Sequence, residues 1–334
     1  MIPSVFYENR IKNETERYLL TTYLLVVLLS SVIGDSFILL ASVRRGAIKL
    51  NKFIVAIMQH IAICDLLRSA GFVIPSIISL IADKWIMGDT MAWTYFFLNA
   101  VTFQVSNYLI CALTTSKCLM LKFPEQTRNW NQRGAHIACI VLGLGSLIFL
   151  VFGISYSHQG IVFNYISYSF EFIVFKSNNS PLLIYVIVVP MIIPTSIIIL
   201  TTFSTLCYLI ESRKAAERSG GRLRWQGMVT VTVTAICYCI SVAPFMISCL
   251  AGVLGGYQLP FWALRIASFL TSLNVMSNFY IYSLTIPSFR QFISSKVSTF
   301  CRSLMAMLYH NLRAMQRGSA TEGERSVRAS GVSI

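Results

Sequence analysis

Long apolar runs dominate this sequence and restrict its fold more than any other feature. A helical run of about 20 apolar residues spans the roughly 30 Å hydrocarbon core of a bilayer. Backbone polar groups inside lipid must be satisfied within the protein, so helices or a closed barrel are the options. Barrel strands would be about ten residues long and would alternate in polarity, whereas these runs are continuous. We expect an all-α membrane protein, a bundle of seven transmembrane helices over residues 18–43, 53–81, 91–121, 136–156, 182–210, 228–254 and 261–286.

The composition supports a membrane location for most of the chain. Hydrophobic residues make up 55% of the 334 residues and charged residues only 12%. Soluble domains carry about 25% charged residues, so an ordinary globular core is excluded. No internal repeat is visible, which disfavours a transporter built from two repeated halves.

Positive charge lies mainly on one side of the predicted bundle. The formal net charge is +14, and lysine and arginine are concentrated in the connections after the first, third and fifth spans and after the seventh. An excess of these residues marks the cytoplasmic side. The N-terminus is therefore expected outside and the C-terminus in the cytoplasm. Topology explains the basic balance, and nucleic-acid binding is not expected.

The predicted segments follow a simple order along the chain. An extracellular N-terminal segment precedes the transmembrane domain, and a short amphipathic eighth helix on the membrane surface precedes a disordered cytoplasmic tail. The four segments are residues 1–17, 18–286, 287–305 and 306–334.

Candidate modification sites agree with this orientation. Glycosylation sequons begin at Asn13 and Asn178, both on the predicted outer side. The nine cysteines lie in spans or on the cytoplasmic side, so no extracellular disulfide is expected. Cys301, in the basic segment after the seventh span, is either a palmitoylation site or an unmodified thiol.

Two acids, Asp35 and Asp65, lie in the middle of the first and second spans. Ionisable residues inside a membrane are costly and indicate function by default. Ser106, Asn274 and Asn278 add polar groups from the third and seventh spans. Such a set suits a cation held by oxygen ligands, or a proton shared by two carboxylates that do not readily both ionise. The alternative is a hydrogen-bond network that joins the helices.

No catalytic or metal-binding constellation is visible in the sequence. The histidines are scattered and lack metal-ligand spacing: His60, His136, His158 and His310. A Gly-rich phosphate loop and the Gly-x-Ser-x-Gly motif are absent. We expect no enzymatic activity, no metal site and no organic cofactor.

Several short motifs occur in a characteristic order along the spans. Residues 61–65, Ile-Ala-Ile-Cys-Asp, are similar to Leu-Ala-x-x-Asp, and residues 84–88 contain Trp-x-x-Gly. Residues 241–244 keep the proline of Cys-Trp-x-Pro, and residues 278–282, Asn-Phe-Tyr-Ile-Tyr, are similar to Asn-Pro-x-x-Tyr. Residues 288–292 look like the start of an amphipathic helix. Over essentially the whole membrane domain, the chain resembles the rhodopsin-like, or class A, G-protein-coupled receptors.

The chain also departs from the pattern of that family. Asp35 replaces asparagine, Ala92 replaces the third-helix cysteine, Ser116-Lys117-Cys118 replaces Asp-Arg-Tyr, Val242 replaces the toggle tryptophan and Phe279 replaces proline. The outer disulfide and the arginine switch of the family are therefore not expected in this chain.

The resemblance implies a buried ion or proton site and a switch in the seventh helix. Asp65, Ser106, Asn274 and Asn278 match the ligand positions of the family's sodium site, so a sodium ion is the candidate bound ion. Asp35 adds a second acid beside it. The hypothesis is that the two acids titrate near neutral pH and couple protonation or sodium to the resting state. Asn278 and Tyr282 match the helix-seven switch.

The resemblance also implies a ligand pocket, with residues at Asn99, Phe103, Gln104, Phe245 and Arg265. An amine ligand is disfavoured because Asn99 stands where amine receptors have aspartate, and covalent retinal is excluded because Ser272 replaces the opsin lysine. Arg265 either pairs an anionic ligand or extends to the headgroups. A lipophilic small molecule or a short peptide fits this pocket.

The function implied is that of a plasma-membrane receptor that carries an extracellular signal to a heterotrimeric G protein. The predicted G-protein face contains Lys117, Arg213, Arg222 and Arg224. The alternative is a non-receptor protein of the bilayer, such as a transporter or a lipid-handling protein. Such a protein would use Asp35 and Asp65 as a proton relay.

Overall fold

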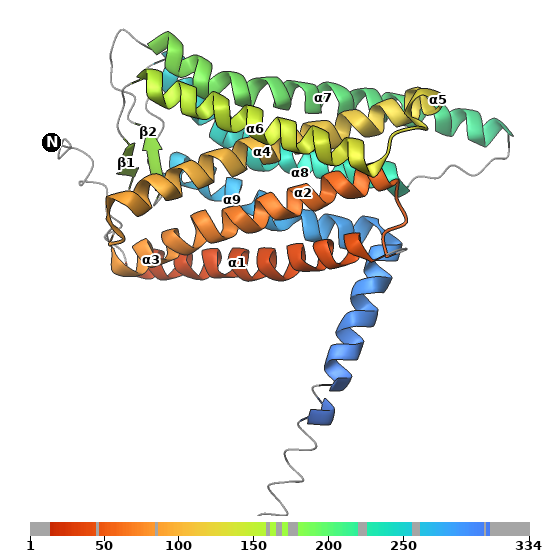
Figure 1. Cartoon of the computed structure of the whole chain (residues 1–334), viewed down its shortest axis with the longest axis horizontal. Coiled ribbons are helices and arrows are strands. Elements are labelled where there is room, and N and C mark those ends of the chain that lie inside the picture. Colours follow the sequence, from red (N-terminus) through yellow and green to blue (C-terminus); the bar gives the residue numbers. More distant parts are fainter. Residues whose placement is uncertain are drawn as a thin grey trace, which may run out of the picture.

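A computed structural model shows long helices packed side by side in one elongated bundle (Figure 1). It describes residues 14–44, 47–83, 86–157, 161–164, 169–172, 180–219, 226–255, 261–303 and 305–307. The predicted sequons at Asn13 and Asn178 lie outside the described residues, as do Arg222, Arg224 and most of the predicted tail.

The helices run in the predicted order. They are α1 (Glu14–Val43), α2 (Lys52–Arg68), the π-helix η2 (Ser69–Val73), α3 (Ile74–Ala82), α4 (Gly88–Lys122), α5 (Pro124–Thr127), α6 (Gln132–Ser157), α7 (Ser180–Ser219), α8 (Gln226–Gly255) and α9 (Phe261–Thr285). In the described residues, six stretches are long and apolar enough to cross a membrane, with α2, η2 and α3 forming one of them. With α9 they make the predicted seven-helix bundle, and the predicted fold class is confirmed.

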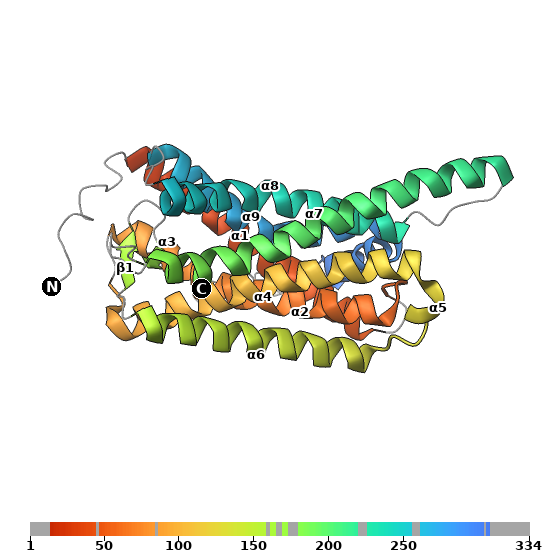
Figure 2. The same cartoon turned by 90° about the horizontal axis from the view of Figure 1, so that it is seen from above.

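The observed helix ends differ from the predicted ends where polar residues extend a helix beyond the apolar run. The fifth span was expected over 182–210, but α7 continues to Ser219 and projects past the bundle (Figure 2). Its last turns contain glutamate, lysine, arginine and alanine, which are good helix formers. The seventh span, expected over 261–286, ends one residue earlier.

A short hairpin, absent from the sequence-based expectations, lies between α6 and α7. Strand β1 (Ile161–Asn164) pairs antiparallel with β2 (Ser169–Phe172), in a register that places Ile161 opposite Phe172. We call this end of the bundle the hairpin end and the opposite end, which holds α5, the α5 end (Figure 1).

The second span contains a π-helical turn that the sequence did not reveal. Pro75 lies in the first turn of α3 and has no backbone N–H to donate to the preceding turn. The helix widens here, and the N–H of Ile74 bonds the carbonyl of Ser69, five residues earlier. Gly71 lies in the same turn, where an added Cβ would be 2.1 Å from Leu98 Cδ2 of α4. The bulge therefore coincides with a close approach of two helices.

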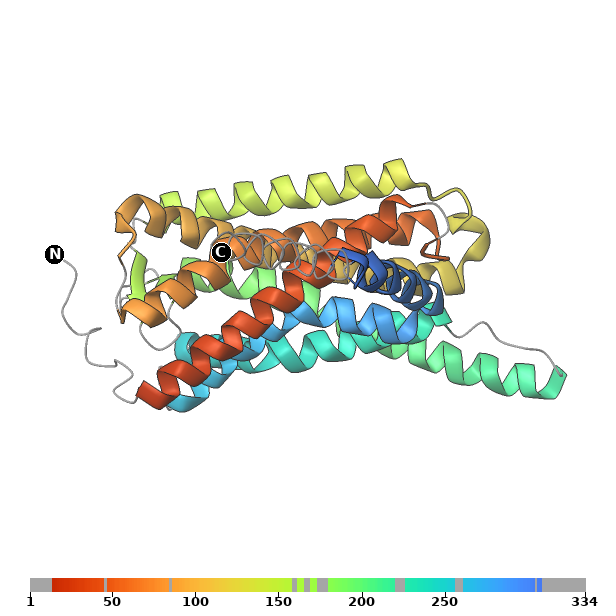
Figure 3. The same cartoon turned by 90° about the horizontal axis from the view of Figure 1, so that it is seen from below.

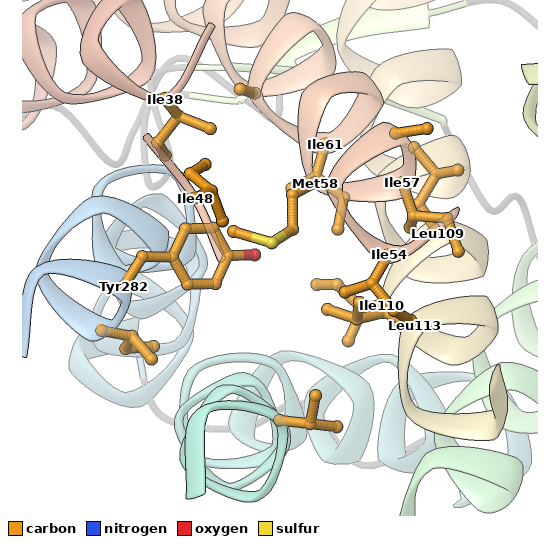
Figure 4. Packing of buried hydrophobic residues seen from close by; sticks show 14 of the residues in the cluster. Ile38, Ile48, Ile54, Ile57, Met58, Ile61, Leu109, Ile110, Leu113 and Tyr282 are labelled. Atoms are coloured by element: carbon orange, nitrogen blue, oxygen red, sulfur yellow. The ribbon is translucent and has the colours of Figure 1, made fainter. Parts of the chain in front are cut away.

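The main hydrophobic core lies in the α5-end half of the bundle. Tyr282 of α9 is fully buried there, and its ring extends toward Met58 of α2 (Figure 4). Residues that face outward on α1 and α6 are mostly aliphatic: Leu29, Val32, Ile33, Ile137, Ile140, Val141, Leu144 and Ile148 are exposed. An apolar outer surface of this extent is expected where lipid, rather than water, surrounds the helices.

Residues 287–303 form a further helix, which we call the tail helix. It leaves the α5 end and runs across the long axis of the bundle (Figure 1). Phe289 and Phe292 are buried against the bundle at 0% and 9% exposure, which fixes the first turns. Its predicted location on the membrane surface remains a prediction.

Candidate functional site

A buried hydrogen bond joins α2 to α9 near the middle of the bundle. Asn278 Nδ2 donates to Asp65 Oδ2 over 2.8 Å. Both side chains are inaccessible, at 1% and 0% exposure. A carboxylate that accepts an amide N–H is a strong link between helices where water does not compete for the bond.

Asp35 is connected to the π-helical turn of the second span through two serines. Ser69 Oγ donates to Ser31 Oγ over 2.7 Å, and Ser31 Oγ donates to Asp35 Oδ2 over 2.6 Å. All three side chains are fully buried. The π-helical turn begins at Ser69, so the same distortion that Pro75 causes places this serine in the chain of hydrogen bonds. The network links α1 to η2.

The two acids belong to one electrostatic cluster. Asp35 and Asp65 are close enough for their charges to interact, and Tyr282 of α9 interacts with both. Ser106 of α4 lies close to the Asp65 carboxylate. Asn274 is buried on α9, one turn before Asn278. The structure thus brings Asp35, Asp65, Ser106 and Asn278 together. Asn274 lies on the same helix as Asn278, but no described contact joins it to the two acids.

The cluster has polar capacity that the described residues do not use. The Oδ1 atoms of Asp35 and Asp65 are buried without a hydrogen-bond partner. The same holds for Ser106 Oγ, Asn278 Oδ1 and the Tyr282 hydroxyl. Buried polar groups are normally paired with protein, water or an ion. Such a group of oxygen atoms is able to hold a proton, water molecules or a small cation.

Arg68 is the functional residue that reading the sequence missed. It lies three residues after Asp65 on α2, is 3% exposed, and interacts electrostatically with Asp65. Its guanidinium carbon is 4.8 Å from the ring centroid of Phe103 and 5.8 Å from that of Phe72. No role for Arg68 was expected from the sequence. The available signal was a basic residue one helical turn from an acid inside an apolar span.

The guanidinium of Arg68 is held by aromatic rings rather than by a direct ion pair. In the described part of the chain, no carboxylate oxygen lies within 4.0 Å of it. Its Nε and Nη1 groups are buried without a hydrogen-bond partner. Opposite charges that do not touch still attract strongly at low dielectric. Among the described side chains, the cluster therefore combines two acids, Asp35 and Asp65, with one cation, Arg68.

The predicted ligand-pocket residues are only partly brought together. The rings of Phe103 and Phe245 are 6.2 Å apart in an edge-to-face arrangement that joins α4 to α8. Gln104 is buried, and Asn99 Oδ1 is buried without a partner. Because Phe103 also contacts Arg68, the predicted pocket adjoins the acid cluster. Arg265 lies on α9, and its side chain is outside the described residues.

The predicted G-protein face is not assembled by the described contacts. Lys117 is half-buried near the end of α4. Arg213 lies on α7, and its side chain is not described. The nearby Lys122 Nζ donates to Ser204 Oγ of α7 over 2.6 Å, which ties α4 to α7 at the α5 end.

Two histidines that looked unrelated in the sequence are in contact. The histidines are scattered along the sequence, but His60 of α2 and His136 of α6 meet in the fold, with His60 Nε2 and His136 Nδ1 2.9 Å apart. The helices pack side by side, and proximity between distant residues does not follow from sequence spacing. In the described residues, no group of three histidine, cysteine or acidic side chains could hold a metal ion.

Comparison with known proteins identifies the fold. The sequence matches no protein-family model and no curated protein. The structure superposes on the crystal structure of squid rhodopsin with a TM-score of 0.75, over 90% of each chain. The chain has the fold of a rhodopsin-like G-protein-coupled receptor. The sequence identity over this match is 14%, so the similarity establishes the fold and not the ligand or the partners.

Proposed function

We propose that the protein is a G-protein-coupled receptor of the plasma membrane. The observation that carries the proposal is the rhodopsin-like fold over 90% of the chain. The positive charge of the connections at the α5 end supports a cytoplasmic location for that end. The N-terminus and the hairpin end then face outward, and the sequons at Asn13 and Asn178 are glycosylation sites.

The proposed ligand site lies around Asn99, Phe103, Gln104 and Phe245, with Arg265 toward the outer end of α9. A ligand that binds one of two packing states better shifts the equilibrium toward that state. The α5 ends of α4, α7 and α8 would then separate and expose Lys117 and Arg213 to a heterotrimeric G protein. The bond between Lys122 and Ser204 is a contact that such an opening must break.

We infer that the acid cluster holds a shared proton in the resting state rather than a sodium ion. One proton on the pair leaves a single negative charge, which the cation of Arg68 balances. A sodium ion would balance the charge only if both carboxylates were ionised, and two close buried acids resist ionising together. The packing of Arg68 between Phe72 and Phe103 keeps its positive charge permanently next to Asp65.

Nucleotide exchange on purified G proteins tests the receptor proposal. The wild-type chain in nanodiscs should accelerate exchange on at least one class of G protein, either basally or with a ligand from a chemically broad library. Lys117→Ala should reduce that rate by about tenfold, because it removes a charged contact with the partner. Glu125→Ala on α5, an exposed residue with no contact in the proposal, is the matched control.

The alternative function predicts a different result from the same protein. A proton-relay transporter would move protons across sealed liposomes in a manner that depends on Asp35 and Asp65. Proton flux without exchange on any G protein would replace the receptor proposal. Exchange without flux would support it.

A further inference from the structure

A small polar cleft lies at the α5 end, away from the acid cluster and the proposed ligand site. Its volume is about 220 Å³. One wall is the connection between α1 and α2, and the other is the junction between α9 and the tail helix. The lining residues are Lys49, Leu50, Thr285, Ile286, Pro287, Ser288 and Gln291.

The two walls of the cleft are fixed to each other. The backbone N–H of Lys49 donates to Ser288 Oγ over 3.1 Å. Behind the cleft, Ile286 and Phe289 are 4% and 0% exposed, so the start of the tail helix is anchored in the main core. The cleft is therefore formed by two distant parts of the chain whose separation is set by packing.

The groups around the cleft are basic or neutral. Lys49 is exposed and forms part of the wall. Close by, Arg44 and Lys296 both contact the ring of Phe292, at 5.8 and 5.9 Å from its centroid. None of the lining residues is acidic. Hydroxyl, amide and ammonium groups in this combination suit a phosphate group, which accepts several hydrogen bonds at once.

If the bundle spans the membrane, the cleft lies at one membrane surface, next to the tail helix. The tail helix runs across the bundle axis (Figures 1 and 3), so it lies along a membrane surface if the bundle spans the membrane. Beyond its anchored first turns, Val297 and Phe300 are exposed, at 44% and 66%. Exposed apolar side chains on a helix of this orientation are suited to the headgroup–acyl boundary. The cleft opens at the start of that helix.

We propose that this cleft binds the phosphate headgroup of an anionic membrane lipid, with a phosphomonoester such as that of phosphatidylinositol 4-phosphate. Lys49 supplies the charge, and Ser288 and Gln291 supply directional polar contacts. Arg44 and Lys296 raise the local positive potential. A lipid bound here would bridge the α1–α2 connection and the tail helix. The proposal concerns the membrane location of the α5 end and does not depend on receptor activity.

Thermal unfolding of the full chain in nanodiscs tests this site. The discs contain phosphatidylcholine alone, or with phosphatidylinositol 4-phosphate, or with phosphatidylserine at matched total charge. The phosphoinositide should raise the unfolding temperature more than phosphatidylserine does. With Lys49→Gln, about ten times more phosphoinositide should be needed for the same rise in unfolding temperature, because one charged contact is lost. Ser288→Ala should weaken it less.

Lys122→Gln is the matched control, since it removes the same charge from the same end of the bundle. It should leave the phosphoinositide effect intact. The proposal is overturned if phosphatidylserine and the phosphoinositide stabilise equally, or if both lysine variants lose the effect equally. If soluble inositol bisphosphate bound as tightly as the phosphoinositide lipid, and if this binding also depended on Lys49, the site would recognise free phosphate rather than a lipid. Equal unfolding temperatures in phosphatidylcholine alone would show that the variants are folded.

Discussion

At the scale of single residues, Asp65 has a partner of a different kind on each side. Asn278 supplies a direct hydrogen bond of 2.8 Å, and Arg68 supplies a charge that does not touch it. Removing one member of a buried charge pair leaves the other uncompensated, and this costs more than the pair itself contributes. The arrangement explains how a chain can tolerate an arginine at 3% exposure inside a membrane bundle.

Neutralising Asp65 and Arg68 in turn measures their coupling. Asp65→Asn and Arg68→Gln should each lower the free energy of unfolding by on the order of 2 kcal/mol, because each removes one partner of the interaction between Asp65 and Arg68. The double variant should lose less than the sum, with a coupling of ~1 to 3 kcal/mol. Chemical denaturation in mixed micelles provides the measurement. Additive losses would contradict a charge interaction, and Arg290→Gln, at an exposed arginine, should have little effect.

The family resemblance predicted that Asp35, Asp65, Ser106 and Asn278 lie together, but the partners of Arg68 and of His60 were not predictable. Asp35 and Asp65 stand out because an acid is rare in an apolar span. Arg68 was equally visible, yet its role depends on Phe103, which is close only after α4 packs on α2. The contact of His60 with His136 depends on packing in the same way. Residue type is local information, whereas a pair across two helices is a property of the bundle.

At the scale of elements, hydropathy predicted the helices, but it did not predict the π-helical turn or the hairpin. Each span is set by a run of apolar residues long enough to cross a bilayer. The π-helical turn at Ser69–Val73 arises from Pro75 together with the fit of Gly71 against Leu98, and a proline alone does not distinguish a kink from a bulge. The hairpin of β1 and β2 is too short for a clear alternating pattern.

The contact of α1 with α9 depends on a small residue (Figure 3). A Cβ added at Gly34 would lie 2.5 Å from Phe279 Cβ and Cγ. Gly34→Ala should therefore push the helices apart and lower the free energy of unfolding by about 1 to 3 kcal/mol. Gly143→Ala on α6 is the matched control, because an added Cβ there has no atom within 4 Å. Equal stability of the two variants, measured by thermal unfolding in nanodiscs, would contradict this account of the contact.

At the scale of the whole molecule, the buried polar network connects elements that are distant in sequence. Asp35 ties α1 to the second span, Asp65 ties the second span to α9, and Ser106 brings in α4. The chain has Ala92, Lys117 and Val242 where the receptors that it resembles have the disulfide cysteine, the switch arginine and the toggle tryptophan. Packing and this network must therefore hold the helices in register. A change in the charge of the network should therefore change the stability of the whole bundle.

The charge state of the network gives a prediction for the dependence on pH and sodium. With one shared proton, Asp35 and Asp65 carry a single negative charge that Arg68 balances. As pH rises and the proton is lost, two buried negative charges face one positive charge, so the unfolding temperature should fall. As pH is lowered again, that stability should return, since the proton restores the balance.

Unfolding temperatures of the purified chain across a pH series, in sodium and in potassium buffers of equal ionic strength, provide the measurement. The two salts should give the same curve, because the buried guanidinium of Arg68 repels a second cation from the acids. Asp35→Asn should remove the loss of stability as pH rises, since one ionised acid, Asp65, is then balanced by Arg68. Ser36→Ala, next to Asp35 but exposed, is the control and should keep the wild-type curve. Stabilisation by sodium that increases as pH rises would mean that the cluster binds the ion, and the shared-proton assignment would then be wrong.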